Sequence, residues 1–179
     1  MKNSKNVITL LLILFLLFIN CKNEGVFDPS LYHPTFKGIT YSTEDGTVLL
    51  EDPEDWHLST TSPYEDLFEP YEIVEIETPH SPSNLPASLQ MDPPYPNPSS
   101  NSITFRYSLM NKATVLIFII DSDRRIVAQL TEVDKLYGSG SYELEWGFKD
   151  IHGHRIPSNI YRCVYRLGHQ MGYGDIWVE

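Results

Sequence analysis

Short apolar segments separated by turn residues fill the C-terminal half of the chain, and this pattern is the strongest restriction on its fold. Six such segments run from 102 to 109, 114 to 121, 126 to 131, 141 to 146, 160 to 167 and 174 to 178. Apolar residues at every second position are typical of strands with one buried face. The number and spacing of the segments predict an all-β fold, namely a small immunoglobulin-like β-sandwich over residues 94–179.

The alternation within the segments identifies the core. Tyr142, Leu144 and Trp146 alternate with two glutamates and therefore share one face of their strand. The segment 114–120 is apolar on both faces, which predicts a central strand with a cover on its outer side, and the middle of the chain is a candidate for that cover. We expect the core to contain Val115, Ile117, Ile119, Tyr142, Leu144, Trp146, Tyr161, Cys163 and Tyr165.

Turn residues separate the strands of this predicted domain. Gly138-Ser139-Gly140 stands between the third and fourth segments, and Asp150-Ile151-His152-Gly153 predicts a tight reversal in which Gly153 can take a positive φ. Pro157 and Asn159 close the same connection before the fifth segment. We therefore assign Asp150, Gly153, Pro157 and Asn159 to turns.

Residues 1–20 have the organisation of an export signal. Lys2 and Lys5 precede an almost unbroken apolar run from Val7 to Ile19, which matches the charged and hydrophobic regions of a secretory signal peptide. A helix of this length spans about 20 Å, whereas the hydrocarbon core of a membrane is about 30 Å thick. We therefore expect a signal peptide over residues 1–20 and not a membrane-spanning helix.

The apolar run ends at Phe18-Ile19-Asn20-Cys21, which resembles the lipobox where bacterial signal peptidase II cleaves. The resemblance implies a lipid on Cys21, which would attach the chain to a membrane; an ordinary signal peptide and an uncleaved anchor are the alternatives. Asn20 departs from the small residue that usually precedes this cysteine. Lys22-Asn23-Glu24 is similar to the surface-export tag of some outer-membrane lipoproteins. We expect a cell-envelope protein anchored in the outer membrane, on its periplasmic or surface face.

The middle of the chain, residues 21–93, has the composition of a tether. Between Cys21 and Asp92 the sequence has 15 acidic residues against two lysines, and 12 of the 13 prolines lie between Pro29 and Pro98. Such segments bury too little apolar area to offset the entropy of ordering. One β-rich pair around Asp45-Gly46 predicts a hairpin over residues 38–50, which needs a surface to dock on because a lone hairpin is marginal. The alternating stretch from Tyr71 to Glu77 predicts a strand for a sheet edge.

Several acidic and histidine clusters in the sequence are candidate metal ligands. The carboxylates at 51, 52, 54 and 55 are hard oxygen ligands suited to Ca²⁺, but they lack the spacing of a calcium-binding loop, and Trp56 after them is better explained as a docking anchor. His152 and His154 flank a turn glycine without a third ligand nearby, and the Asp121-Ser122-Asp123 stretch reads as a strand-end reversal. We expect no metal and no cofactor.

The C-terminal half resembles a known β-sandwich family. The relevant residues are Tyr95-Pro96-Asn97-Pro98, Ile103 to Leu109, Val115 to Asp121, and the Trp146…Asp150-x-x-Gly153…Pro157-Ser158-Asn159-Ile160-Tyr161 run. Together they resemble the immunoglobulin-like domain of the flagellar hook-capping protein and related C-terminal domains of type IX secretion substrates. The resemblance implies a β-sandwich that mediates assembly, or a sorting address that a type IX-like translocon recognises.

The sequence departs from that family at three places. Arg124 stands where the family usually has a turn glycine, Asn159 replaces the glycine before Ile-Tyr, and the end Trp177-Val178-Glu179 lacks the basic residues common in sorting tails. The last departure favours a permanent structural or adhesive module over a sorting address.

No catalytic motif is present in the sequence. It contains no Gly-x-Ser-x-Gly elbow, no His-Glu-x-x-His helix, no Cys-x-x-Cys pair and no phosphate-binding glycine loop with lysine. A net charge of -11 disfavours nucleic acid as a partner. We therefore expect a non-enzymatic, lipid-anchored protein whose sandwich contacts another envelope or secretion protein.

Overall fold

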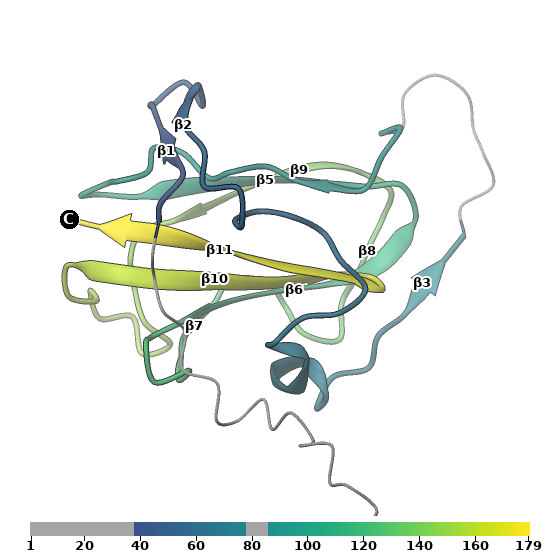
Figure 1. The fold of residues 1–179 in the computed structure, drawn as a ribbon. Coiled ribbons are helices and arrows are strands. Elements are labelled where there is room, and N and C mark those ends of the chain that lie inside the picture. Colours follow the sequence, from purple (N-terminus) through teal and green to yellow (C-terminus); the bar gives the residue numbers. More distant parts are fainter. Residues whose placement is uncertain (1–37, 78–85) are drawn as a thin grey trace, which may run out of the picture.

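Two antiparallel sheets pack face to face in the computed structural model, which describes residues 38–77 and 86–179 (Figure 1). The predicted all-β sandwich is confirmed. The first sheet has the order β11-β10-β6-β3, with β7 and β8 also pairing with β6, and the second has the order β4-β5-β9. A separate two-stranded hairpin comprises β1 and β2. The strands are β1 (Tyr41–Ser42), β2 (Val48–Leu50), β3 (Glu75–Ile76), β4 (Gln90–Met91), β5 (Ile103–Leu109), β6 (Lys112–Ile120), β7 (Ile126–Gln129), β8 (Leu136–Tyr137), β9 (Gly140–Trp146), β10 (Asn159–Leu167) and β11 (Gln170–Val178).

The long strands lie where the alternation predicts them. Five of the six expected segments agree with β5, β6, β7, β9 and β10 to within two residues at each end. The sixth segment was expected to begin at Gly174, but β11 begins at Gln170. Gly172 and Gly174 interrupt the apolar pattern there, and for this reason the local sequence conceals the first half of the strand.

Strand β6 is the centre of the molecule and is buried on both faces. Val115, Ile117 and Ile119 point into the cluster between the two sheets. Leu116, Phe118 and Ile120 point outward into a second cluster, where Tyr64 and Phe68 cover them. Phe68 belongs to a short 3-10 helix, η2 (Glu65–Phe68), and its ring stacks on Phe118 with centroids 5.6 Å apart.

Residues 38–77 pack against the sandwich, although we expected them to belong to a tether spanning residues 21–93. We call them the wrapping segment. In Figure 1 the chain passes from the β1–β2 hairpin along β11, turns at η2 and ends at β3, which adds to β6. The average composition of the segment concealed this outcome, because a few large aromatic side chains are enough to bury its inner face while most of its carboxylates stay in water.

The predicted hairpin and edge strand are both present in the wrapping segment. β1 and β2 pair antiparallel around a turn in which the Gly46 amide donates to the Thr43 carbonyl, and Gly46 has φ 83°. β3 occupies the end of the predicted stretch 71–77, where Glu75 and Ile76 pair with Ala113 and Lys112. The strand does not extend to Val74, because the Val74 amide donates to the Thr114 side-chain hydroxyl and not to a backbone carbonyl of β6.

Candidate functional site

The predicted lipidation site lies outside the described residues. Cys21, the predicted signal peptide over residues 1–20 and the first part of the expected tether all precede Gly38. The structure therefore describes the sandwich and the wrapping segment, and the candidate sites are surfaces and buried groups of these parts.

The nine side chains predicted for the core fall into two groups. Tyr142 and Leu144 are only half-buried, because β9 is at the edge of its sheet. The ring of Tyr142 stacks on Tyr107 with centroids 5.0 Å apart, and its hydroxyl donates to the Gly138 carbonyl at 2.7 Å. The other seven are buried in the cluster between the sheets: Val115, Ile117, Ile119, Trp146, Tyr161, Cys163 and Tyr165.

The predicted turn residues organise the connection between β9 and β10. The Asp150 carboxylate accepts hydrogen bonds from the backbone amides of His152 and His154 at 2.8 and 2.9 Å, and these bonds lower its pKa. Gly153 has φ 82°, as its place in the turn requires. The Pro157 carbonyl accepts the Tyr161 hydroxyl at 3.0 Å, and Asn159 is the first residue of β10.

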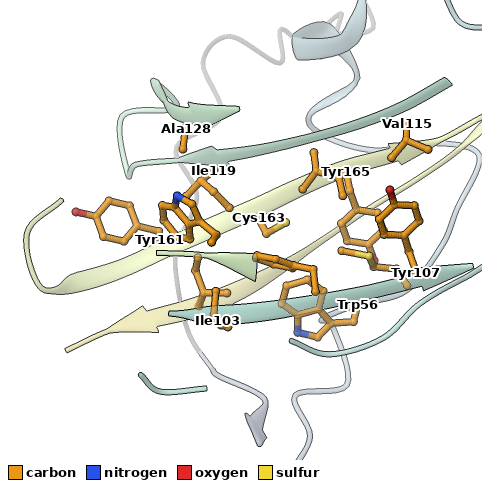
Figure 2. Close-up of a cluster of buried hydrophobic side chains, with 14 of the residues drawn as sticks. Trp56, Ile103, Tyr107, Val115, Ile119, Ala128, Tyr161, Cys163 and Tyr165 are labelled. Atoms are coloured by element: carbon orange, nitrogen blue, oxygen red, sulfur yellow. The ribbon is translucent and has the colours of Figure 1, made fainter. Parts of the chain in front are cut away.

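Trp56 fastens the wrapping segment to the core. It is 6% exposed, and its ring stacks on Tyr165 with centroids 6.0 Å apart and an interplanar angle of 2°. Figure 2 shows Trp56 entering the cluster beside Tyr165, with Cys163 near the middle. The Trp56 amide donates to the Tyr173 carbonyl at 2.7 Å. Trp56 therefore has the docking role that its position after the acidic stretch predicts.

Two glycines of β11 make room for this anchor. A Cβ on Gly174 would lie 2.2 Å from Trp56 Cε2, and a Cβ on Gly172 would lie 2.2 Å from the His57 carbonyl oxygen. Farther along, the Ser59 and Met171 backbones exchange two hydrogen bonds of 2.7 Å. The chain around Trp56 is thus held along β11 by its backbone while its indole replaces missing side chains on the inner face of that strand.

A buried ionic cluster lies on the outer face of β10 and β11. Arg162 donates to both carboxylate oxygens of Asp175 at 2.6 and 2.8 Å and to the Tyr64 hydroxyl at 2.7 Å. Arg162 and Asp175 are 5% and 1% exposed. A buried pair of this kind is strongly destabilising when one partner is removed, because the remaining charge is left without compensation. The Tyr64 bond makes the wrapping segment part of the cluster.

This cluster was not identified from the sequence, although a signal for it exists. β10 and β11 form a tight hairpin in which Leu167 pairs with Gln170, and counting outward from that turn places Arg162 opposite Asp175. Opposite charges at directly paired positions stabilise a sheet. The alternation of the strand marks Arg162 as an outward residue, but only the wrapping segment makes that outward face buried.

Asp55 extends the same cluster into the wrapping segment. Its carboxylate accepts the Asp175 backbone amide at 3.2 Å, and its side chain is buried. Burial and the nearby Asp175 charge raise the pKa of Asp55 to about 7. Asp55 therefore joins the wrapping segment to β11, whereas its neighbours Glu51 and Glu54 are exposed.

Arg124 joins the wrapping segment to the turn before β7. Its guanidinium pairs with Asp66 at 2.5 Å and lies over the Tyr64 ring, 5.4 Å from the centroid. Arg124 has φ 63°, the left-handed conformation that glycine adopts most easily. The backbone thus keeps the shape expected of a turn glycine, while the side chain adds a clamp that glycine cannot supply.

Asn97 of the Tyr-Pro-Asn-Pro motif connects three parts of the fold. Its side-chain amide donates to the carbonyls of Thr40 and Asp175 at 2.9 and 3.1 Å, and its side-chain oxygen accepts the Trp177 amide at 2.9 Å. Its backbone also exchanges two hydrogen bonds with Ser42 of β1. Asn97 is fully buried, so the motif fixes the hairpin to the end of the sandwich.

The hairpin exposes an apolar strand on the other side of this attachment. Val48, Leu49 and Leu50 are 41%, 68% and 60% exposed and make up all of β2. Figure 1 shows the hairpin projecting from one end of the sandwich above β5. A second feature, an open groove with a cavity volume of about 760 Å³, lies over β5 and β9 and is lined by polar residues that include Gln90, Asp92, Arg106 and Glu143.

The acidic and histidine clusters weighed as metal ligands have other contacts. Across residues 38–77 and 86–179 no group of three or more His, Cys, Asp or Glu side chains is arranged to hold a metal ion. The Asp121 carboxylate accepts the amides of Asp123 and Arg125, each at 2.9 Å, and thereby forms the strand-end reversal. The rings of His152 and His154 have centroids 6.3 Å apart.

Comparison of the chain with protein-family models, curated proteins and solved structures gives no match. Within the described residues, no helix is long and apolar enough to cross a membrane. The sheets and their pairing define the class of fold: an all-β sandwich against which the wrapping segment, residues 38–77, packs.

Proposed function

We propose that this chain is a lipid-anchored cell-envelope protein whose immunoglobulin-like β-sandwich mediates protein contact without catalysis. The observation that carries the anchor is the succession of Lys2, Lys5, the apolar run from Val7 to Ile19, and Cys21. Bacterial lipoproteins carry more than one acyl chain, and a pair of chains gives effectively stable attachment.

The contact role is supported by the way the sandwich is built. Its buried polar residues bind the wrapping segment to the sheets, as Asn97 and Arg162 do. The exposed features of the described residues include the projecting apolar strand β2 and the open groove over β5 and β9. Exposed apolar residues grouped on one element are a common mark of protein interaction sites.

A second candidate function is a secretion address recognised by a type IX-like translocon. The Trp146 to Tyr161 run favours it, because its residues resemble those of type IX C-terminal domains.

Intact-protein mass spectrometry of the membrane fraction tests the anchor. We expect a lipid-modified chain that begins at Cys21, and we expect the modification and the membrane association to disappear in Cys21→Ala. An unmodified mature chain in the soluble fraction would overturn the anchor and favour the secretion address.

Removal of residues 94–179 separates the two functions. If the sandwich is a contact module, the lipidated remainder still reaches the same membrane face, as measured by protease accessibility on whole cells. Retention of that remainder inside the cell, with its lipid intact, would instead assign the sandwich an export role.

A further inference from the structure

Strand β2 has an exposed and unpaired edge within the described residues. It is the outer strand of the hairpin, and within residues 38–77 and 86–179 no strand pairs with its free side. An unpaired edge exposes backbone donors and acceptors that another extended chain can satisfy. All three of its side chains, Val48 to Leu50, are apolar and exposed, so the edge also carries the side chains that pack against an added strand.

The structure holds this edge in place before any partner arrives. β1 is fixed between β2 and the Asn97 backbone: the Ser42 amide donates to the Asn97 carbonyl at 2.9 Å, and the Asn97 amide donates to the Ser42 carbonyl at 3.1 Å. The Ser42 hydroxyl also donates to the Pro94 carbonyl at 2.5 Å. Inside the turn, the Asp45 carboxylate accepts the Thr43 hydroxyl and the Thr47 amide. A binding surface that is already ordered loses less entropy when it binds.

The charges around β2 define the partner. Residues 38–77 have 12 acidic residues and no Lys or Arg. Glu44, Asp45, Glu51 and Glu54 flank β2 on both sides along the chain and are exposed. Apolar side chains between two acidic flanks are complementary to an extended apolar segment between two basic flanks.

We propose that β2 binds, by strand addition, an extended segment of a partner protein with alternating apolar residues and Lys or Arg at both ends. This inference rests on the proposed contact function and names the surface and the partner chemistry for it. A second copy of this chain is disfavoured, because pairing β2 with itself would bring two sets of acidic flanks together. An anionic membrane surface is disfavoured by the same charges.

Peptide binding to the full chain in neutral detergent tests the proposal. The probe is a fluorescent nine-residue peptide with Val at three alternating central positions and two Lys at each end. We expect saturable binding by fluorescence anisotropy, weakened at least tenfold when salt is raised from 50 to 500 mM. Two control peptides should fail to bind: one with Glu in place of Lys, and one with methylated backbone amides that cannot donate hydrogen bonds.

Matched variants locate the site on β2. Leu49→Lys and Glu51→Lys should each weaken binding of the basic peptide at least tenfold. The controls are Ile151→Lys, which matches Leu49→Lys, and Glu69→Lys, which matches Glu51→Lys. Both change exposed residues elsewhere on the molecule and should leave binding within twofold. The thermal melting temperatures of all four variants should match the wild type, since none of the four side chains is buried.

Several results would overturn the proposal. These are no saturable binding of the basic peptide, equal binding of the Glu or methylated peptide, or unchanged binding in Leu49→Lys. Loss of self-association or of binding to anionic vesicles in Leu49→Lys, with peptide binding unaffected, would assign β2 to a second copy or to a membrane. Because the assay does not require lipid on Cys21, failure of the anchor leaves its outcome unchanged, and the two hypotheses fail separately.

Discussion

Single buried polar residues hold the wrapping segment at defined positions. Asn97, Asp55 and Arg162 each make hydrogen bonds to elements far away in the sequence, such as the bond between the Asp175 amide and Asp55, which spans 120 residues. A buried polar group without a partner costs about 1–3 kcal/mol, so these residues specify one docked arrangement over others. At this scale the stability of the protein depends on a few individual side chains.

Replacing Asn97 with Ala should lower the free energy of unfolding by about 2–4 kcal/mol, because two buried backbone carbonyls and one partly buried amide lose their partner. Urea denaturation followed by tryptophan fluorescence measures the change. Asn101→Ala is the matched control at an exposed position of the same loop and should change stability by less than about 0.5 kcal/mol. Equal effects of the two substitutions would show that the Asn97 bonds contribute nothing to stability.

Asp55 should make the stability of the protein depend on pH. Its pKa is about 7 in the folded protein against an ordinary value of 3.8. Because the folded state binds the proton more tightly, this contribution is complete below about pH 4 and is lost as pH rises through about 7. We expect the melting temperature to fall between pH 5 and pH 8, and Asp55→Asn to reduce that fall.

Differential scanning calorimetry at several pH values between 5 and 8 measures this effect. Asp175, whose pKa burial also raises, acts in the same direction and remains in the variant. The difference between wild type and Asp55→Asn therefore isolates Asp55. An unchanged slope in Asp55→Asn would contradict the assignment.

The strands of the fold differ in whether their inner face is filled by their own side chains or by side chains of the wrapping segment. Strands β5 and β9 alternate between buried and more exposed side chains, whereas β6 and β10 are buried on both faces over most of their length. All four pair over long registers. β11 is different, because its inner face has glycine at 172 and 174 and needs Trp56 and His57 to fill the space. The wrapping segment therefore supplies the packing that side chains of β11 would otherwise provide at positions 172 and 174.

Gly174→Ala tests this relation between two elements. The added methyl overlaps the indole of Trp56, and overpacking of this kind costs about 1–3 kcal/mol. In a Trp56→Ala background the overlap is gone, so the same substitution should cost less than about 0.5 kcal/mol. A double-mutant cycle by urea denaturation measures the coupling, and additive effects would mean that Trp56 is not packed against Gly174.

The whole molecule has a wrapping segment that is acidic outside and aromatic inside. Its 12 carboxylates, without any Lys or Arg, exceed the whole net charge of -11, so the rest of the chain is close to neutral. The same segment covers the outer apolar face of β6 through Tyr64 and Phe68. Without the segment, a row of large apolar side chains on β6 would face water, and exposed patches of this kind promote association.

Deletion of residues 38–77 should therefore cause the protein to aggregate. We expect the shortened chain to bind the dye 1-anilinonaphthalene-8-sulfonate strongly and to elute as aggregates in size-exclusion chromatography, because Leu116, Phe118 and Ile120 lose their cover. The full chain is the control and should bind little dye. A monomeric shortened chain with an unchanged melting temperature would show that the wrapping segment is dispensable for folding.

The sequence by itself determined strands β5, β6, β7, β9 and β10, the reversal from Asp150 to Gly153, and the two-sided burial of β6. It did not indicate the two-residue strands β4 and β8 or the first half of β11. These features depend on alternation and turn chemistry within a few residues, which are local properties. The hairpin over residues 38–50 and the strand within 71–77 were predictable for the same reason. The resemblance carried by Tyr95 to Pro98 and by Trp146 to Tyr161 indicated the sandwich but not the structural role of Asn97.

Only the tertiary structure decided that the wrapping segment is folded and that Arg162, Asp175 and Asp55 form one buried cluster. The segment's acidic, proline-rich average predicted a tether, and burial of a few residues such as Trp56 and Phe68 outweighed that average. The contribution of Trp56 and Phe68 to stability depends on distant strands, which provide the space at Gly174 and the ring of Phe118. The spacing of residues within a short stretch of sequence contains no information about these contacts. The physical reason is that burial and long-range pairing are properties of the assembled sheets.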